Sequence, residues 1–253
     1  MSQQTLTLPQ NKSGAKLIRF LLITSIFGAF ILLVRILTSV LLIAGMFGGI
    51  LFLAAGRIDW LEAWVLTGIY GVFLFSFMMW AALYAPDLLR ERNRMAGNVK
   101  PWDKMINLTF TLAFITLLVV SGLDSRKGWS VVHVLLQLMG VVGITLSCMI
   151  ILWTMRINAF LSRWARIQND RGHQVVSTGP YRFVRHPMYS AIIVFILSAP
   201  LELGSWWAVI PSGLAVLIYV ARTQKEDQML REELHGYREY ASKVRYRLIP
   251  GLW

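Results

Sequence analysis

Residues 20–55 form an apolar stretch in which Arg35 is the single charged residue. A helix that crosses a bilayer needs about 20 apolar residues, because the hydrocarbon core is about 30 Å thick. The stretch is therefore too long for one ordinary span. Residues 36–55 fit one crossing, whereas residues 20–34 are compatible with either an interfacial helix or an extra tilted span.

Long apolar stretches recur at residues 60–84, 105–123 and 130–153, and shorter ones lie at residues 188–199 and 206–221. The first short stretch cannot cross a bilayer upright, and a breaker-rich segment follows it. We therefore expect a helical hairpin that returns to its starting side. Only 15% of the residues are charged, against about 25% in soluble domains. The sequence predicts an all-α polytopic integral membrane protein with about five to seven transmembrane segments.

The basic residues concentrate in the polar segments at residues 85–104, 156–185 and 222–253. The turns expected between the other ends of the spans carry few basic residues, and these turns lie at residues 56–59, 124–128 and 201–205. The positive-inside rule places the basic side, with the C-terminus, in the cytoplasm. The net charge of +12 then reflects contact with membrane lipids, and no nucleic-acid partner is expected.

Several chemistries are disfavoured by the sequence. Cys148 is the only cysteine, so an intrachain disulfide and a cysteine metal site are excluded. No histidine–acid pair has metal-ligand spacing, and no Gly-rich nucleotide-binding motif or P-loop is present, so no metal is expected. Glu202 lies at a span end and is expected to snorkel to the interface, and His173 and His235 are expected to be exposed.

The densest polar motif reads Gly-Pro-Tyr-Arg-Phe-Val-Arg-His-Pro-Met-Tyr and occupies residues 179–189. Pro180 and Pro187 restrict the backbone around the polar side chains between them. This high density of hydrogen-bond donors beside an apolar stretch predicts that the motif forms the edge of a binding site. A second polar run follows the hairpin at residues 222–250 and contains the acidic pair Glu226-Asp227.

The two polar runs, in this order and with the hairpin between them, resemble the signature of the isoprenylcysteine carboxyl methyltransferase and phospholipid methyltransferase superfamily. The resemblance covers about residues 158–250. It implies transmembrane helices in residues 1–155 and a methyltransferase core in residues 156–253. It also implies S-adenosylmethionine as cofactor, bound on the cytoplasmic side.

The resemblance assigns roles to individual residues. His186, Pro187 and Tyr189 would line the adenosine or methionine part of the cofactor, and Glu226 would bond one of its hydroxyl or amino groups. Arg222 would lie nearer the acceptor. The resemblance leaves open which role belongs to Glu226 and which to Asp227. The catalytic candidates are Arg222 and Glu226. The cofactor-binding candidates are Tyr181, Arg185, His186, Pro187, Tyr189, Glu226, Tyr237 and Tyr240.

These residue types suit methyl transfer. The reaction is a direct displacement, so the protein mainly has to hold donor and acceptor in line, and tyrosine faces attract the positive sulfonium. A carboxylate acceptor is ionised at neutral pH and needs no base, so Arg222 could orient it by paired hydrogen bonds. An amine or thiol acceptor would need a base, for which Glu226 or His186 would serve.

The sequence therefore predicts a membrane methyltransferase that acts on a lipophilic small molecule or lipid-modified group, with an isoprenylcysteine-type carboxylate as first choice. The alternatives are a phospholipid or other small-molecule N- or S-methyltransferase, an NADPH-dependent sterol-type membrane reductase, and a non-enzymatic transporter or scaffold. Simpler explanations also exist for single residues. Tyr181 and Tyr189 could belong to an interfacial aromatic belt, and Arg222 could form a surface salt bridge with Glu226.

Overall fold

The computed structural model describes residues 12–93 and 99–253, with side chains described for residues 27–92 and 99–253. Within these residues every regular element is a helix, which confirms the predicted all-α class. Two compact units are present, residues Met1–Ser39 and Val40–Trp253, and each is considered by itself. Four helices in the described residues are long and apolar enough to cross a membrane.

Helix α1 (Lys12–Ala55) begins in the first unit and ends in the second. Its helical backbone is continuous through residues 20–34, so this stretch is not a separate interfacial helix. The segment Phe27–Ala55 is long and apolar enough to span a bilayer. The part of α1 from residue 40 onward contributes Phe47, Leu51 and Ala55 to the core of the second unit.

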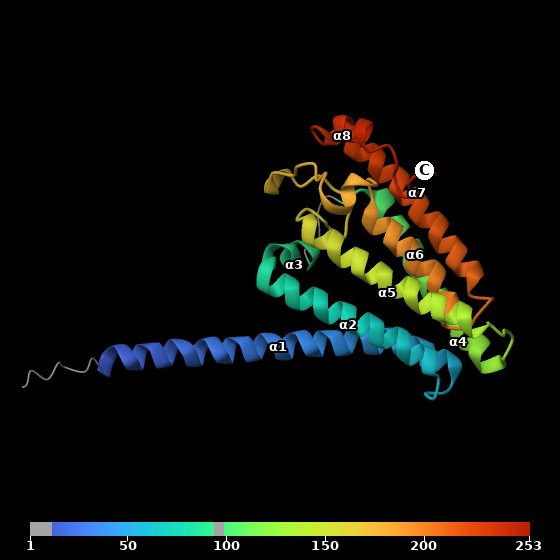
Figure 1. Cartoon of the computed structure of the whole chain (residues 1–253), viewed down its shortest axis with the longest axis horizontal. Helices are drawn as coiled ribbons and strands as arrows, with labels where there is room; N and C mark the ends of the chain where they lie inside the picture. The colour runs from blue at the N-terminus through green and yellow to red at the C-terminus, as the bar shows by residue number, and fades with distance from the viewer. Residues whose placement is uncertain (1–11, 94–98) are drawn as a thin grey trace, which may run out of the picture. The chain divides into compact units, whose positions relative to one another are not determined.

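The second unit contains seven further α-helices among the described residues (Figure 1). They are α2 (Leu61–Tyr84), α3 (Pro86–Asn93), α4 (Pro101–Lys127), α5 (Val134–Ile157), α6 (Pro187–Glu202), α7 (Val209–Glu233) and α8 (Tyr237–Lys243). Local sequence explains several boundaries. Pro101 and Pro187 occupy the first turns of α4 and α6, where a missing N–H costs nothing. Gly128 ends α4 in the left-handed conformation with φ 64°.

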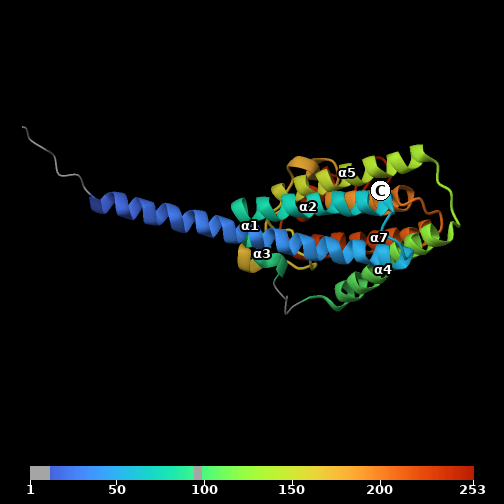
Figure 2. The same ribbon diagram turned by 90° about the horizontal axis from the view of Figure 1, so that it is seen from below.

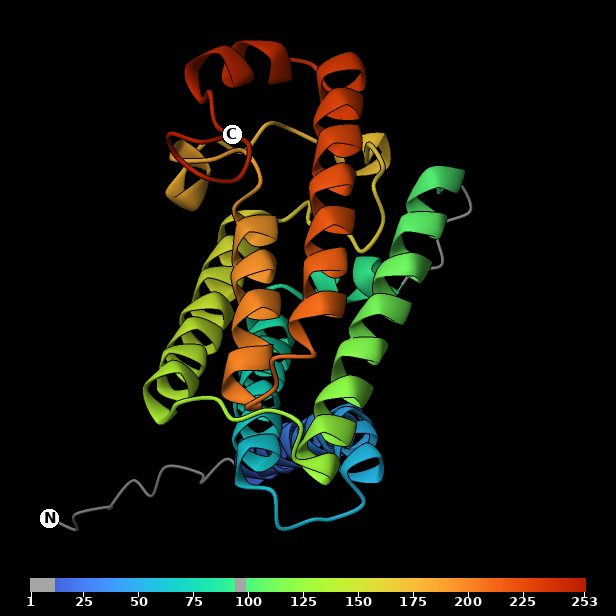
Figure 3. The same ribbon diagram turned by 90° about the vertical axis from the view of Figure 1, so that its right-hand side faces the viewer.

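The predicted hairpin is present as α6 and α7, but its second limb is longer than expected. Figure 3 shows α7 continuing beyond the start of α6 toward α8. The helix does not stop at residue 221 and runs on into the charged region as far as Glu233. Hydropathy changes at residue 221, whereas helical propensity does not, because Lys, Glu, Gln and Arg are good helix formers. Helix α7 therefore carries its polar end out of the apolar zone.

Helix α5 packs against α6, and α4 packs against α7, while Figure 2 shows α2 beside α5. Gly140 allows the close approach of α5 to α6. A Cβ atom at this position would lie 2.5 Å from the backbone nitrogen of Glu202 and 2.8 Å from the carbonyl oxygen of Ser198. Backbone atoms cannot move aside as a flexible side chain could, so this position requires glycine.

We therefore expect Gly140→Ala to lower the thermal unfolding midpoint of the detergent-solubilised protein, because the two helices would have to separate. Gly213→Ala is the matched control, since a Cβ atom there meets nothing within 4 Å. Alanine also has a higher helix propensity than glycine, so Gly213→Ala should not lower the midpoint. Equal midpoints for the two variants, measured by a fluorescence melting curve, would contradict the packing described here.

The three turns predicted to share one side of the membrane meet in the structure. The Nη2 atom of Arg57 donates to Ser125 Oγ at 3.1 Å, and Ser205 Oγ donates to Asp124 Oδ2 at 2.5 Å. The backbone N–H of Trp206 donates to Ser130 Oγ at 3.1 Å. Figure 3 shows the loop after α5, helix α8 and the C-terminus at the opposite end of α5, α6 and α7.

The prediction that Glu202 snorkels to the interface is wrong. Its side chain is buried, and its Oε2 atom has no hydrogen-bond partner among the described residues. The cause is the close contact at Gly140, which places the last turn of α6 directly against α5. Hydropathy locates a residue along the membrane normal, but it does not show which helix covers the side chain.

Candidate active site

The buried carboxylate of Asp227 on α7 joins the two polar runs. Its Oδ1 atom accepts hydrogen bonds from Arg185 Nε at 2.7 Å and from Tyr237 Oη at 3.0 Å. Its Oδ2 atom accepts from Arg231 Nε at 3.0 Å and Arg247 Nε at 3.1 Å. One carboxylate thus holds together the motif before the hairpin, helix α7 and the C-terminal segment.

Backbone hydrogen bonds strengthen this junction. The N–H groups of Arg185 and His186 donate to the carbonyl oxygens of Tyr246 and Arg247, both at 2.9 Å. The Nη1 atom of Arg185 also donates to the carbonyl oxygen of Val244 at 2.7 Å. The guanidinium of Arg185 is therefore held by protein partners, and the side chain is buried.

Burial alone would raise the pKa of Asp227. The hydrogen bonds from His186 and Arg185, and the positive charge of the guanidinium, outweigh this effect and hold the pKa of Asp227 well below its usual range. The carboxylate is thus ionised at neutral pH. Its role in the structure is that of a fixed negative charge between several cations.

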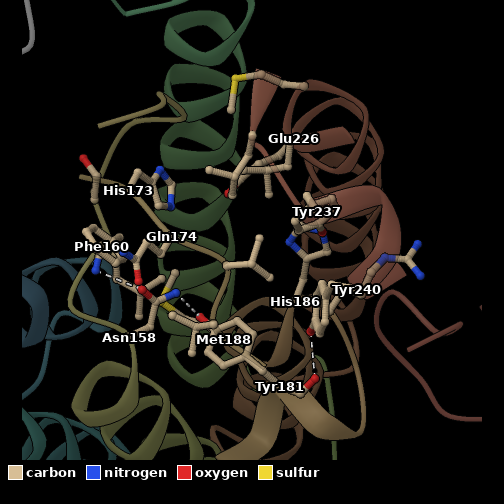
Figure 4. Close-up of a pocket in the computed structure, with 18 of the residues that line it drawn as sticks. Asn158, Phe160, His173, Gln174, Tyr181, His186, Met188, Glu226, Tyr237 and Tyr240 are labelled. Atoms are coloured by element: carbon tan, nitrogen blue, oxygen red, sulfur yellow. Dashed lines mark hydrogen bonds between the residues drawn. The ribbon is translucent and has the colours of Figure 1, made fainter. Parts of the chain in front are cut away.

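A pocket lies beside this junction and encloses about 730 Å³ of empty space, part of it open to solvent. Figure 4 shows side chains from the loop after α5, from α6 and α7, and from α8 around the pocket. The predicted site residues that line it are Tyr181, Arg185, His186, Tyr189, Glu226, Tyr237 and Tyr240.

Glu226 is the one acidic residue among those that line the pocket. Its Oε2 atom accepts a hydrogen bond from Tyr189 Oη at 2.5 Å, and the Tyr189 ring stacks on His186 at a centroid distance of 5.7 Å. Successive residues of a helix point about 100° apart. The neighbouring acids therefore face different surroundings, with Asp227 in the junction and Glu226 at the pocket.

The other tyrosines use their hydroxyl groups to hold the wall together. Tyr240 Oη donates to the carbonyl oxygen of Tyr181 at 2.7 Å, and Asn158 Nδ2 donates to Tyr181 Oη at 2.8 Å. Burial raises the pKa values of Tyr181, Tyr237 and Tyr240 above their ordinary value, so these hydroxyls stay protonated. Tyr181 and Tyr189 are buried, which excludes an interfacial aromatic belt as their role.

Arg222 and Pro187 do not line the pocket. The Nε atom of Arg222 lies 3.1 Å from Asp103 Oδ1 on α4, and its Nη2 atom donates to the carbonyl oxygen of Arg163 at 3.0 Å. Its guanidinium lies 5.3 Å from the centre of the Tyr189 ring. The ion-pair partner of Arg222 is therefore Asp103 rather than Glu226, and Pro187 starts α6.

Residues 158–176 of the loop after α5 supply much of the pocket wall, although none of them was predicted to line a site. His173 was expected to be exposed, but it is half-buried and lines the pocket. Burial, and then the nearby charges of Arg166 and Arg171, lower its pKa, which favours the neutral imidazole. The lining residues not predicted are Asn158, Phe160, Leu161, Ser162, Arg166, His173, Gln174, Val175, Val176, Met188, Met229, Leu230 and Leu234.

The fold and the pocket define an integral membrane protein with a pocket for a small molecule at one end of its helices. Residues 135–236 match the family model described as phospholipid methyltransferase. This match confirms the predicted resemblance over that part of the chain and supports a membrane methyltransferase. It covers the polar motif, the hairpin and both neighbouring acids. A search among curated proteins finds no match.

Proposed function

We propose that the protein methylates a lipophilic acceptor at the membrane and uses S-adenosylmethionine as the methyl donor. The observation that carries this proposal is the pocket in which Glu226, held by Tyr189, faces a wall of buried tyrosines. The proposal includes the division predicted from the sequence, with residues 156–253 as the methyltransferase core. It also includes a cytoplasmic position for the pocket, since basic residues predominate at that end.

The lining residues fit this cofactor. Tyrosine ring faces attract a sulfonium cation, and Glu226 offers an acceptor for a hydroxyl or amino group. Methionine, leucine and valine side chains supply apolar surface, as is usual in cofactor sites. When bound, S-adenosylmethionine supplies a methyl group activated by a positively charged sulfur. The protein's own task is to orient the donor and to exclude water from it.

The acceptor determines which groups of the chain are needed. An isoprenylcysteine-type carboxylate, our first choice, is already ionised and requires orientation alone. A phospholipid amine, the alternative that the matched family description supports, requires a base. Glu226 lines the pocket and suits this role. His186 also lines the pocket, but its Nε2 atom lies 3.4 Å from Asp227 Oδ1 within the junction.

The arginines of the pocket argue against an NADPH-dependent reductase. A 2′-phosphate needs a cation that is free to bind it. Arg166 donates to Glu91 Oε1 from Nη2 at 2.6 Å, and Arg185 donates to Asp227 Oδ1 from Nε at 2.7 Å. Both arginines that line the pocket therefore already have carboxylate partners.

Calorimetry of the full chain in neutral detergent, with S-adenosylmethionine and NADPH titrated separately, tests the proposal. We expect binding of S-adenosylmethionine alone, because the pocket offers an acid and aromatic faces but no unpaired arginine. Binding of NADPH alone would overturn the proposal in favour of a reductase. Binding of neither compound would favour a transporter or scaffold.

A further inference from the structure

Arg92 on α3 has an unusual environment that neither the pocket nor the junction explains. Its Nη1 atom is buried and has no hydrogen-bond partner among the described residues. The guanidinium lies 5.6 Å from the centre of the Phe77 ring on α2, so one face packs against an aromatic side chain. No carboxylate of the described residues forms an ion pair with it, since the neighbouring Glu91 is paired with Arg166.

The surroundings of Arg92 contain a like charge but no acid that is paired with it. Burial lowers the pKa of Arg92, Tyr219 opposes this shift, and the like charge of Arg163 acts with it. Arg92 is therefore a half-buried cation that has no acid of its own among the described residues.

Phe77 connects this region to the methyl-donor pocket. The guanidinium of Arg92 packs on the Phe77 ring. Phe77 belongs to a hydrophobic cluster that also contains Leu161 and Met188. Both of these residues line the pocket. Arg92 therefore packs against a cluster that borders the donor pocket.

We infer that Arg92 binds an oxyanion of the lipophilic acceptor and so positions the acceptor for methylation, an inference that rests on the proposed function. A guanidinium offers planar paired donors that fit both carboxylate and phosphodiester oxygens. The shared chemistry is thus an anionic oxygen group at the head of an amphiphile. The two acceptors left open under the proposed function both carry such a group.

A binding role and a purely structural role for Arg92 predict opposite effects of its replacement on stability. Burying part of a cation without a partner costs stability, so Arg92 weakens the folded state unless something binds it. Replacing Arg92 by methionine, which has similar length and no charge, should leave the thermal unfolding midpoint unchanged or higher. A residue that served the fold would lower the midpoint when replaced.

The test measures binding of three twelve-carbon amphiphiles to the full chain in neutral detergent by calorimetry. The probes are dodecyl phosphate, dodecanoate and dodecanol. We expect at least one anionic probe to bind about 10-fold or more tighter than dodecanol. Arg92→Met should weaken that probe roughly 10- to 100-fold, the usual range for a hydrogen bond to a charged group. Arg92→Lys should retain part of the affinity.

Arg90→Met is the matched control, because Arg90 lies on the same helix with its side chain exposed and pairs with Asp87. It should leave all three affinities unchanged. The inference is overturned if Arg92→Met binds the anions as wild type does, or if Arg90→Met loses as much affinity as Arg92→Met. It is also overturned if the unfolding midpoint of Arg92→Met falls below that of wild type. Tighter binding of dodecyl phosphate favours an acceptor that carries a phosphate group, and tighter binding of dodecanoate favours a carboxylate acceptor.

Titration of S-adenosylmethionine on the same samples tests the proposed function separately from the role of Arg92. Arg92→Met should bind it as wild type does, because Arg92 does not line the donor pocket. Failure of wild type to bind S-adenosylmethionine would overturn the proposed function. The amphiphile measurements would still decide whether Arg92 is an anion site.

Discussion

Replacing Glu226 by alanine is expected to weaken S-adenosylmethionine binding at least about 30-fold while the protein stays folded. Removing one partner of a buried charged hydrogen bond costs about 2–5 kcal/mol, and each 1.4 kcal/mol is about a factor of 10 in affinity. Glu226 is the one acid among the lining residues, so no neighbour can replace it. Calorimetry of the detergent-solubilised variant gives the affinity.

Two further variants separate the charge from the fold. Glu226→Gln keeps an acceptor for the hydroxyl of Tyr189 but removes the negative charge, so we expect an intermediate loss. Glu232→Ala changes an exposed acid on the same helix, outside the lining residues, and should bind as wild type does. If Glu226→Ala binds S-adenosylmethionine normally, the assignment of this site is wrong even if the protein is a methyltransferase.

The second large effect is expected for Asp227→Asn, which should destabilise the protein by about 3–5 kcal/mol at neutral pH. Breaking a buried ion pair on one side leaves the opposite charge without compensation. Here Arg185, Arg231 and Arg247 would share that loss. Glu239→Gln provides the comparison, because its ion pair with Lys243 is exposed, and it should leave the unfolding midpoint unchanged.

The effect of Asp227 should depend on pH in a defined direction. The folded state depresses the pKa of Asp227, so its contribution is fully present above the unfolded pKa of about 3.9 and declines progressively as pH falls from there toward the lower folded pKa. We therefore expect the midpoints of wild type and Asp227→Asn to begin to converge below about pH 4. A constant difference between pH 7 and pH 3 would contradict a structural role for the ionised carboxylate.

The sequence predicts features that depend on short segments of the chain. Apolar length identifies the long spans and the hairpin, because the bilayer thickness sets the length of a spanning helix. Pro187 marks the start of α6, since its missing N–H fits a first turn. The two polar runs identify seven of the lining residues, and the family match covers this part of the chain as far as residue 236.

The tertiary structure decides which side each of these residues faces and which partner it meets. Glu226 and Asp227 are adjacent, yet one faces the pocket and the other ties the junction, because a helix turns about 100° per residue. Glu202 is buried because Gly140 lets α5 approach. His173 precedes the first polar run by six residues, and Arg92 lies far from both runs in the sequence. Neither residue is part of a regular pattern. Their surroundings are created only when distant helices and loops pack together, and no local pattern encodes such contacts.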